Sequence, residues 1–134
     1  MALALDTPRP FCEGDFGDHR VLNAVKIYEG AVVSITAAGY AKGYAGTDTI
    51  FAGIAVKQAD NSSGAAGAIT VKCRRGIFFA EVTLASAAQT DVGTTIYASD
   101  DGTFTLTSTS NLAVGVISRL AGTNLVEVKF ATAV

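Results

Sequence analysis

From residue 24 onward, hydrophobic and polar side chains alternate with a period of two in several short stretches. In one of them, Phe78 and Val82 alternate with Phe79, Glu81 and Thr83. The same alternation occurs at Val33 and Ile35, at Ile54 and Val56, at Ile69–Cys73, at Phe104 and Leu106, and at Val126–Phe130. A period of two repeated this often predicts antiparallel strands with one face buried.

The connections between these stretches are also typical of an all-β chain. Asp101-Gly102 separates two alternating runs and predicts a hairpin. Residues 59–68 form a polar, glycine-rich stretch that predicts a loop, and residues 85–91 could form one or two helical turns. Strands spaced by eight to twelve residues predict a small antiparallel β-barrel or β-sandwich.

One glycine pattern occurs twice in the chain. Gly30, Gly39 and Gly53 mark the first copy, residues 30–56, and Gly93, Gly102 and Gly115 mark the second, residues 93–117. Each copy leads into a further alternating stretch. We therefore predict one β domain over residues 24–134 with an internal pseudo-repeat.

Residues 1–23 lack both the alternation and a helical period. They contain both prolines, the only histidine and the run EGDFGD. We interpret them as an extended N-terminal arm that is ordered only where it contacts a neighbouring protein; a frayed terminus is the alternative. The residues expected to make the contact are Leu3, Leu5, Pro8, Pro10, Phe11 and Phe16.

Composition and charge lower the expectation for several classes of function. Charged residues make up 16% of the 134 residues and the net charge is −2, with Arg74-Arg75 the only adjacent pair of cations. Nucleic-acid binding needs clustered cations, so no nucleic-acid partner is expected. No apolar run is long enough to span a bilayer, and the start of the chain lacks the features of a signal peptide, so we expect no membrane partner.

The residue types that carry catalysis or metal binding are sparse. His19 is the only histidine, and a catalytic triad would have to use it. Glu13, Asp15 and Asp18 miss the spacing of a calcium-binding loop, and a solvated acidic turn is the better interpretation. We therefore expect no catalytic residue, no metal and no cofactor.

Two further features have structural interpretations. The glycine-rich run from Gly39 to Gly46 lacks the Lys-Ser or Lys-Thr of a phosphate-binding loop, so these glycines are expected in turns. Cys12 and Cys73 fit no metal spacing, and Cys73 is expected to pack as a small apolar residue without a disulfide.

Several segments, taken in order, resemble the capsid cement or head decoration proteins of tailed bacteriophages. The segments are IYEGAVVSITAAGYAKG, FAGIAV, ITVKCRRGIFFAEV, DVGTTIYASDDGTFTLT, LAVGVI and LVEVKF, within residues 24–131. In this resemblance Gly30, Gly76 and Gly93 match structural turn glycines; Gly102 joins them from the hairpin signal.

The resemblance implies a structural virion protein without enzymatic activity. Such a protein would be made in the bacterial host cytoplasm, would bind the major capsid protein on the outer surface of the expanded head, would stabilise contacts between capsomers, and would form a homotrimer. The alternatives are another virion β-module of a tail or fibre, a carbohydrate-binding or adhesion domain, and a small β-barrel enzyme.

Overall fold

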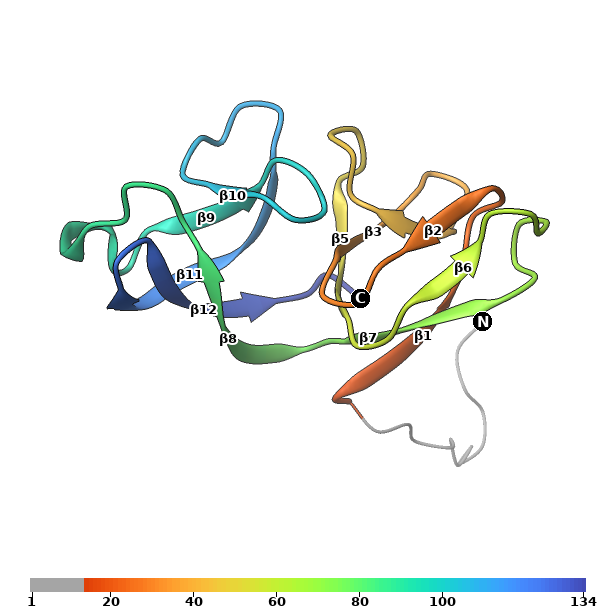
Figure 1. Cartoon of the computed structure of the whole chain (residues 1–134), viewed down its shortest axis with the longest axis horizontal. Helices are drawn as coiled ribbons and strands as arrows, with labels where there is room; N and C mark the ends of the chain where they lie inside the picture. Colours follow the sequence, from red (N-terminus) through yellow and green to blue (C-terminus); the bar gives the residue numbers. More distant parts are fainter. Residues whose placement is uncertain (1–13) are drawn as a thin grey trace, which may run out of the picture.

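The computed structural model describes residues 14–134, which form an all-β fold of three antiparallel sheets (Figure 1). This confirms the predicted class: the described strands close no barrel, and a β-sandwich-like class fits them. The strands are β1 (Phe16–Arg20), β2 (Val25–Ile27), β3 (Val32–Ile35), β4 (Ala41–Gly43), β5 (Ile50–Ala55), β6 (Ala59–Asn61), β7 (Thr70–Arg74), β8 (Ile77–Thr83), β9 (Thr95–Ala98), β10 (Phe104–Thr105), β11 (Leu112–Gly122) and β12 (Leu125–Ala131). A single 3-10 turn, η1 (Gln89–Asp91), lies within the stretch where helical turns were expected.

The two five-stranded sheets have the same topology. If the strands of each sheet are numbered in chain order, both sheets have the spatial order first, fifth, fourth, second, third. Sheet 1 has the order β1-β7-β5-β3-β4, and sheet 2 has the order β8-β12-β11-β9-β10. In Figure 1 the two sheets form two lobes side by side, called here the first half and the second half. The glycine-marked window 30–56 contains β3–β5, and the window 93–117 contains β9, β10 and the first part of β11; these strands occupy equivalent places in the two sheets.

A glycine stands at a register shift in the middle strand of each sheet. The β3–β5 pairing skips one residue beside Gly53, and the β9–β11 pairing skips one beside Gly115. A Cβ on Gly53 would collide with the carbonyl oxygen of Arg74, and one on Gly115 with that of Lys129. Only glycine therefore allows the neighbouring strand to approach this closely.

Sheet 1 is buried on both faces near its centre. Val33 and Ala52 pack into a small core that sheet 1 shares with the two-stranded β2–β6 ribbon. Val32 and Phe51 point the other way, into a large core shared with sheet 2. The sequence predicted one buried face per strand; that is wrong for β3, where Ser34 is also buried and donates a hydrogen bond to Asp48 Oδ2 at 2.7 Å.

The predicted boundary of the arm at residue 23 is wrong. Phe16–Arg20 form β1, which pairs antiparallel with β7 along its full length, from Phe16 opposite Arg74 to Arg20 opposite Thr70. The hydrogen bonds of this ladder hold the segment in sheet 1, although its side chains give no hydrophobic alternation. Residues 1–13, which include the other expected contact residues of the arm, lie outside the described residues.

The predicted loop at residues 59–68 begins as strand β6, which pairs with β2. Asn61 ends this strand and is buried. Its side-chain amide donates to the carbonyl oxygens of Leu22 and Ala65, both at 2.9 Å. A polar residue can be buried there because its donors are satisfied by backbone acceptors.

The expected turn glycines differ in conformation. Gly30, Gly76 and Gly93 have φ between 81° and 88°, in the left-handed region that suits glycine. Gly102 does not have a positive φ; its N–H donates to the Asp100 carboxylate at 2.8 Å in the connection between β9 and β10. The hairpin exists, but an aspartate side chain closes its loop in place of a two-residue glycine turn.

Candidate interaction surface

Three large hydrophobic side chains lie on the outer face of sheet 2. Ile77 and Phe79 of β8 are 67% and 58% exposed, and Val116 of β11 is 40% exposed. Phe79 is paired with Lys129 of β12, and Lys129 is paired with Val116 of β11, so these residues form one row across three strands. We call Ile77, Phe79 and Val116 the apolar strip, which Lys129 interrupts between Phe79 and Val116.

The positions of Ile77 and Phe79 follow from the alternation of β8. Phe78 lies between them and points inward, where its ring stacks on Phe130 with centroids 5.1 Å apart. Successive side chains of a strand point to opposite faces, so burying Phe78 places its two apolar neighbours in solvent. When one face of such a strand is buried in the core and the other also carries large apolar residues, the exposed face is available to bind a partner.

A charged row borders the apolar strip. Glu81 of β8 stands opposite Glu127 of β12, and Arg119 of β11 bonds to both carboxylates, at 3.3 and 3.2 Å. The arginine offsets the repulsion between two like charges that face each other across the strands. A patch of aromatic and aliphatic side chains with a polar rim is the usual composition of a protein–protein contact.

Phe16 is the one expected arm residue that the structure describes. It is partly exposed on β1, at the free edge of sheet 1. The cationic groups of Lys72 and Arg74 lie 4.9 and 5.3 Å from the centre of its ring. Both distances are within the range of cation–π interactions, so the two cations hold the Phe16 ring against sheet 1.

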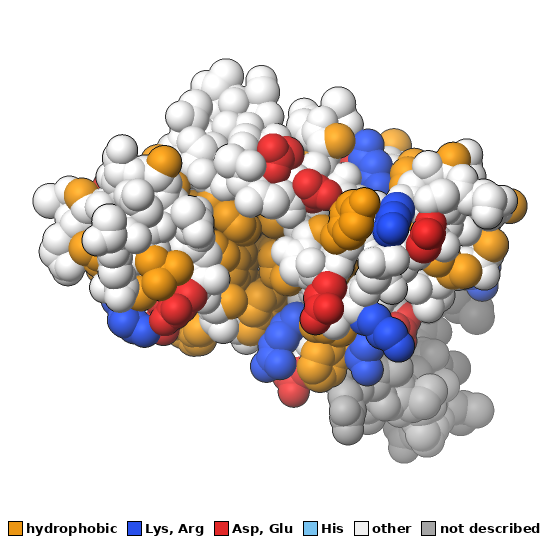
Figure 2. Space-filling model, in the orientation of Figure 1, with side chains coloured by type: hydrophobic (Ala, Val, Ile, Leu, Met, Phe, Trp, Pro, Cys, Tyr) orange, Lys and Arg blue, Asp and Glu red, His pale blue; other side chains and the backbone are white. Residues whose placement is uncertain are grey.

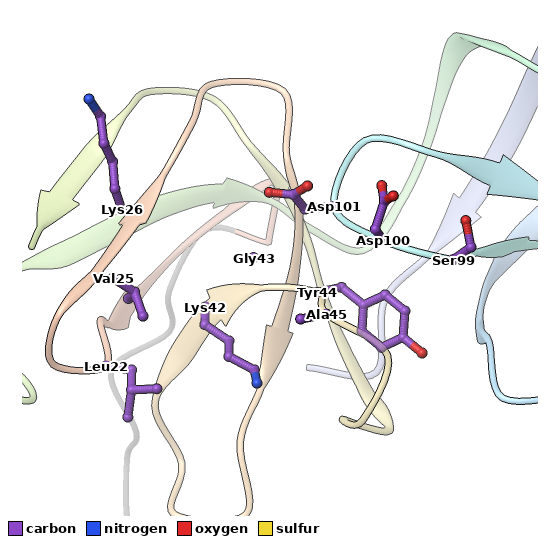
Figure 3. Close-up of a pocket in the computed structure, with 10 residues that line it drawn as sticks. All are labelled: Leu22, Val25, Lys26, Lys42, Gly43, Tyr44, Ala45, Ser99, Asp100 and Asp101. Atoms are coloured by element: carbon purple, nitrogen blue, oxygen red, sulfur yellow. The ribbon is translucent and has the colours of Figure 1, made fainter.

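A groove of about 680 Å³ runs between the halves (Figure 3). Its lining residues are Leu22, Val25, Lys26, Lys42, Gly43, Tyr44, Ala45, Ser99, Asp100 and Asp101. The charged groups do not converge: Lys42 pairs with Asp48 at 3.5 Å, and Lys26 lies over the Tyr28 ring and points away from the aspartates in Figure 3. The Asp101 carbonyl oxygen accepts a hydrogen bond from Val32 N at 2.8 Å, so this groove is a seam that joins the halves.

The titratable residues singled out in the sequence are spread over sheet 1. Burial and the nearby Arg75 charge lower the pKa of His19, and its Nε2 atom is buried without a hydrogen-bond partner among the described residues. Burial raises the pKa of the Cys73 thiol to about 12. Cys73 is fully buried and packs in the small core, as expected, whereas Cys12 lies outside the described residues. Within residues 14–134, no cluster of three or more His, Cys, Asp or Glu side chains could hold a metal ion.

The apolar strip was not among the contact residues expected from the sequence. Phe79 had been placed on the solvent side of the alternation, and that placement is confirmed. The sequence does contain a signal for it. The solvent side of residues 77–83 carries Ile77 and Phe79, whereas the solvent side of residues 125–131, the strand that pairs with it, carries Glu127 and Lys129.

Comparison of the chain with protein-family models, with curated proteins and with solved structures gave no match. In the described part of the chain no helix has the length and hydrophobicity to cross a membrane.

Proposed function

We propose that this chain is a capsid cement, or head decoration, protein of a tailed bacteriophage. In this role it binds the major capsid protein on the outer surface of the expanded head and stabilises the contacts between capsomers. It is a structural virion protein, made in the bacterial host cytoplasm, and it acts as a homotrimer without a chemical step. The sequence segments that resemble this family support the proposal.

The observation that carries the proposal is the apolar strip on the outer face of sheet 2. Ile77 and Phe79 stand on β8 and Val116 on β11, and the sheet holds these strands in fixed register through β12 between them. Because the backbone of these strands is already ordered before binding, little conformational entropy is lost when the contact forms. A rigid face with an aromatic anchor and a charged rim suits a shell of fixed geometry.

Repetition makes a modest contact sufficient for such a role. A protein that binds the expanded shell and not its precursor stabilises the expanded state by mass action. A trimer that engages several sites at once gains further affinity from the high effective concentration of its second and third contacts. The strip needs only a moderate affinity per copy to stabilise the whole head.

The test is co-sedimentation of the purified chain with expanded heads and with unexpanded precursor heads of the parent phage. We expect saturable binding to expanded heads only. Phe79→Ser should weaken this binding about tenfold or more, since aromatic anchors at the centre of a contact carry most of the affinity.

Leu106→Ser is the matched control. Leu106 is 41% exposed, like Val116, but it follows β10 and lies off the strip. Equal weakening of binding by the two substitutions would show that the apolar strip is not part of the contact with the head. No binding of the unmodified chain to expanded heads would contradict the proposal itself.

A further inference from the structure

The internal repeat extends to single residues. In both sheets the pairing of the second strand with the fourth skips one residue of the fourth strand, beside the glycines described above. Gly30 N donates to the Ala55 carbonyl oxygen, and Gly93 N donates to that of Ile117, both at 2.8 Å. The two sheets therefore share one hydrogen-bonding pattern, in which Gly30 corresponds to Gly93 and Ala55 corresponds to Ile117.

The edge strands β1 and β8 correspond in the same way. Just beyond the pairing of β1 with β7, Val21 N donates to the Ile69 carbonyl oxygen at 3.0 Å. Just beyond the pairing of β8 with β12, Leu84 N donates to the Asn124 carbonyl oxygen at 2.9 Å. Positions on β1 and β8 can therefore be matched by counting back from these two bonds.

By this count Phe16 of β1 corresponds to Phe79 of β8. Each phenylalanine stands opposite a cation, and each cation stands opposite an aliphatic residue of the next strand. Each sheet thus carries a row in which an aromatic, a cationic and an aliphatic side chain follow one another across three strands. The first row consists of Phe16, Arg74 and Ile54, and the second of Phe79, Lys129 and Val116.

Both rows have exposed apolar surface. Phe16 is 39% exposed, and Phe79 and Val116 are exposed as described above, whereas Ile54 is partly buried against the large core. In Figure 1 β1 and β8 both lie along the lower side of the molecule. Figure 2 shows Lys and Arg side chains beside hydrophobic ones along that side. The exposed parts of both rows can therefore contact one surface.

The two cations define the charge that a partner needs. Arg74 and Lys129 are exposed, and within residues 14–134 neither forms an ion pair with a carboxylate. An exposed cation beside an aromatic ring favours a carboxylate that has apolar neighbours, because the charges attract and the apolar groups cover the ring. The matching segment of a partner is one in which an acidic residue is flanked by apolar residues.

We propose that Phe16 with Arg74 and Phe79 with Lys129 form two equivalent docking sites, and that each site binds the same acidic–apolar segment of a different copy of one partner protein. One chain then bridges two neighbouring copies. The inference rests on the proposed function for the identity of this partner, the major capsid protein, whose copies repeat across the head. The equivalence of the two sites rests on the structure alone.

Two sites in one rigid body bind more tightly than either site alone. The large core joins sheet 1 to sheet 2, so the spacing of the sites is fixed. Once one site is occupied, the second meets its segment at a high effective concentration, provided that the spacing of the copies matches. The next row differs in charge, because Lys72 in sheet 1 corresponds to Glu127 in sheet 2. Both sites keep the ring and the cation on which the contact depends.

Photo-cross-linking tests the equivalence directly. Phe16 or Phe79 is replaced by the photoreactive benzoylphenylalanine, and the full chain is bound to expanded heads of the parent phage and irradiated. Peptide mass spectrometry should show that both positions cross-link to the same segment of the major capsid protein. Tyr28 is the control position, because it is 57% exposed next to the β2–β6 ribbon and lies in neither row. Cross-linker at Tyr28 should not yield that segment.

The outcomes separate this inference from the proposed function. Cross-links to two different segments, to a second copy of this chain, or from only one of the two positions would overturn the inference and leave the proposed function in place. Failure of the unmodified chain to bind expanded heads would contradict both.

Charge substitutions measure what each site contributes. Arg74→Gln and Lys129→Gln should each weaken binding to expanded heads about tenfold or more, because only one site remains, and the double variant should not bind. Arg74→Lys should bind within about threefold of the unmodified chain, because the second site also uses a lysine.

Lys26→Gln is the matched control, since it removes an exposed cation from the β2–β6 ribbon, and it should leave binding unchanged. Equal urea midpoints will show that all variants are folded. Binding by Arg74→Gln or by Lys129→Gln at the strength of the unmodified chain would overturn the inference, as would equal weakening by Lys26→Gln.

Discussion

Val128 shows at the scale of one residue why sheet 2 tolerates change on one face and not on the other. Its side chain has no exposed surface and packs in the large core, whereas its neighbours Glu127 and Lys129 lie on the outer face. An unpaired charge at the buried position would lose its hydration without gaining a partner.

Val128→Asp should therefore lower the free energy of unfolding by about 4 kcal/mol or more, or abolish folding. Val116→Asp, on the exposed face of the adjacent strand, should change it by less than about 1 kcal/mol. Urea denaturation followed by circular dichroism gives both values. Similar losses at the two positions would mean that the faces of sheet 2 are assigned incorrectly.

Gly115 illustrates a steric requirement at a single position. An added Cβ would collide with the Lys129 carbonyl oxygen, whereas a Cβ on Gly122, in the same strand, would meet Leu125 at an ordinary contact distance of 3.8 Å. Gly115→Ala should cost about 2 kcal/mol of stability through overpacking, and Gly122→Ala less than about 0.5 kcal/mol. Equal denaturation midpoints for the two variants would show that strands β11 and β12 can separate without cost.

His19 should make stability depend on pH near neutrality. Burial, then the charge of Arg75, lowers its pKa in the folded state, and the nearby Asp18 opposes this shift. The unfolded chain therefore binds a proton more readily, so stability is full above pH 6.5 and falls as the pH drops below it toward the folded-state pKa. In His19→Gln the urea midpoint should depend less on pH between pH 7.5 and about 5. A wild-type midpoint that rises as the pH falls through this range would contradict the lowered pKa of His19.

At the scale of elements, the sequence predicted the strands whose one face is buried and whose other face is polar. β7 and β12 alternate in this way and were predicted from their period of two. β1, β2, β4 and β6 were not predicted. β2, β4 and β6 have three residues each, which is too few to show a period of two, and β1 is mostly polar; backbone pairing holds all four in their sheets. The burial of β3 on both faces was also missed, since it depends on contacts with the distant second half of the chain.

The candidate surface could be predicted only in part, for a related reason. The alternation placed Phe79 in solvent, but only the register of β8, β12 and β11 shows that it shares a row with Val116. The charged row likewise depends on Arg119 reaching both Glu81 and Glu127 across the strands. Such proximities between distant residues are set by sheet register, which the local pattern leaves open.

Two deletions test the corrected role of β1. Removing residues 1–13 should leave sheet 1 intact, with cooperative unfolding retained. Removing residues 1–20 also removes β1, which leaves the edge of β7 unpaired and uncovers the small core near Val71 and Cys73. We expect the larger deletion to lower the denaturation midpoint much more than the smaller one, because it loses ladder bonds and buried area together. Equal midpoints would show that β1 contributes nothing to the fold.

At the scale of the whole molecule, the large core makes the two halves one body. Val32 and Phe51 of sheet 1 pack with sheet 2, and the C-terminal segment returns to sheet 1, where Ala133 N donates to the Phe51 carbonyl oxygen at 2.9 Å. Tyr44 and Ser110 add a hydrogen bond across the halves at 3.4 Å. A body joined in this way can transmit force between two neighbours that bind to different faces, as bracing a shell requires.

The central claim is that this rigid body braces the outside of an expanded phage head through the outer face of sheet 2. Cryo-electron microscopy of the parent virion tests it most directly. The account predicts density for this chain on the outer capsid surface, with Ile77 and Phe79 against the major capsid protein or a neighbouring copy. Density for the chain only in the tail, or its absence from the virion, would contradict the account.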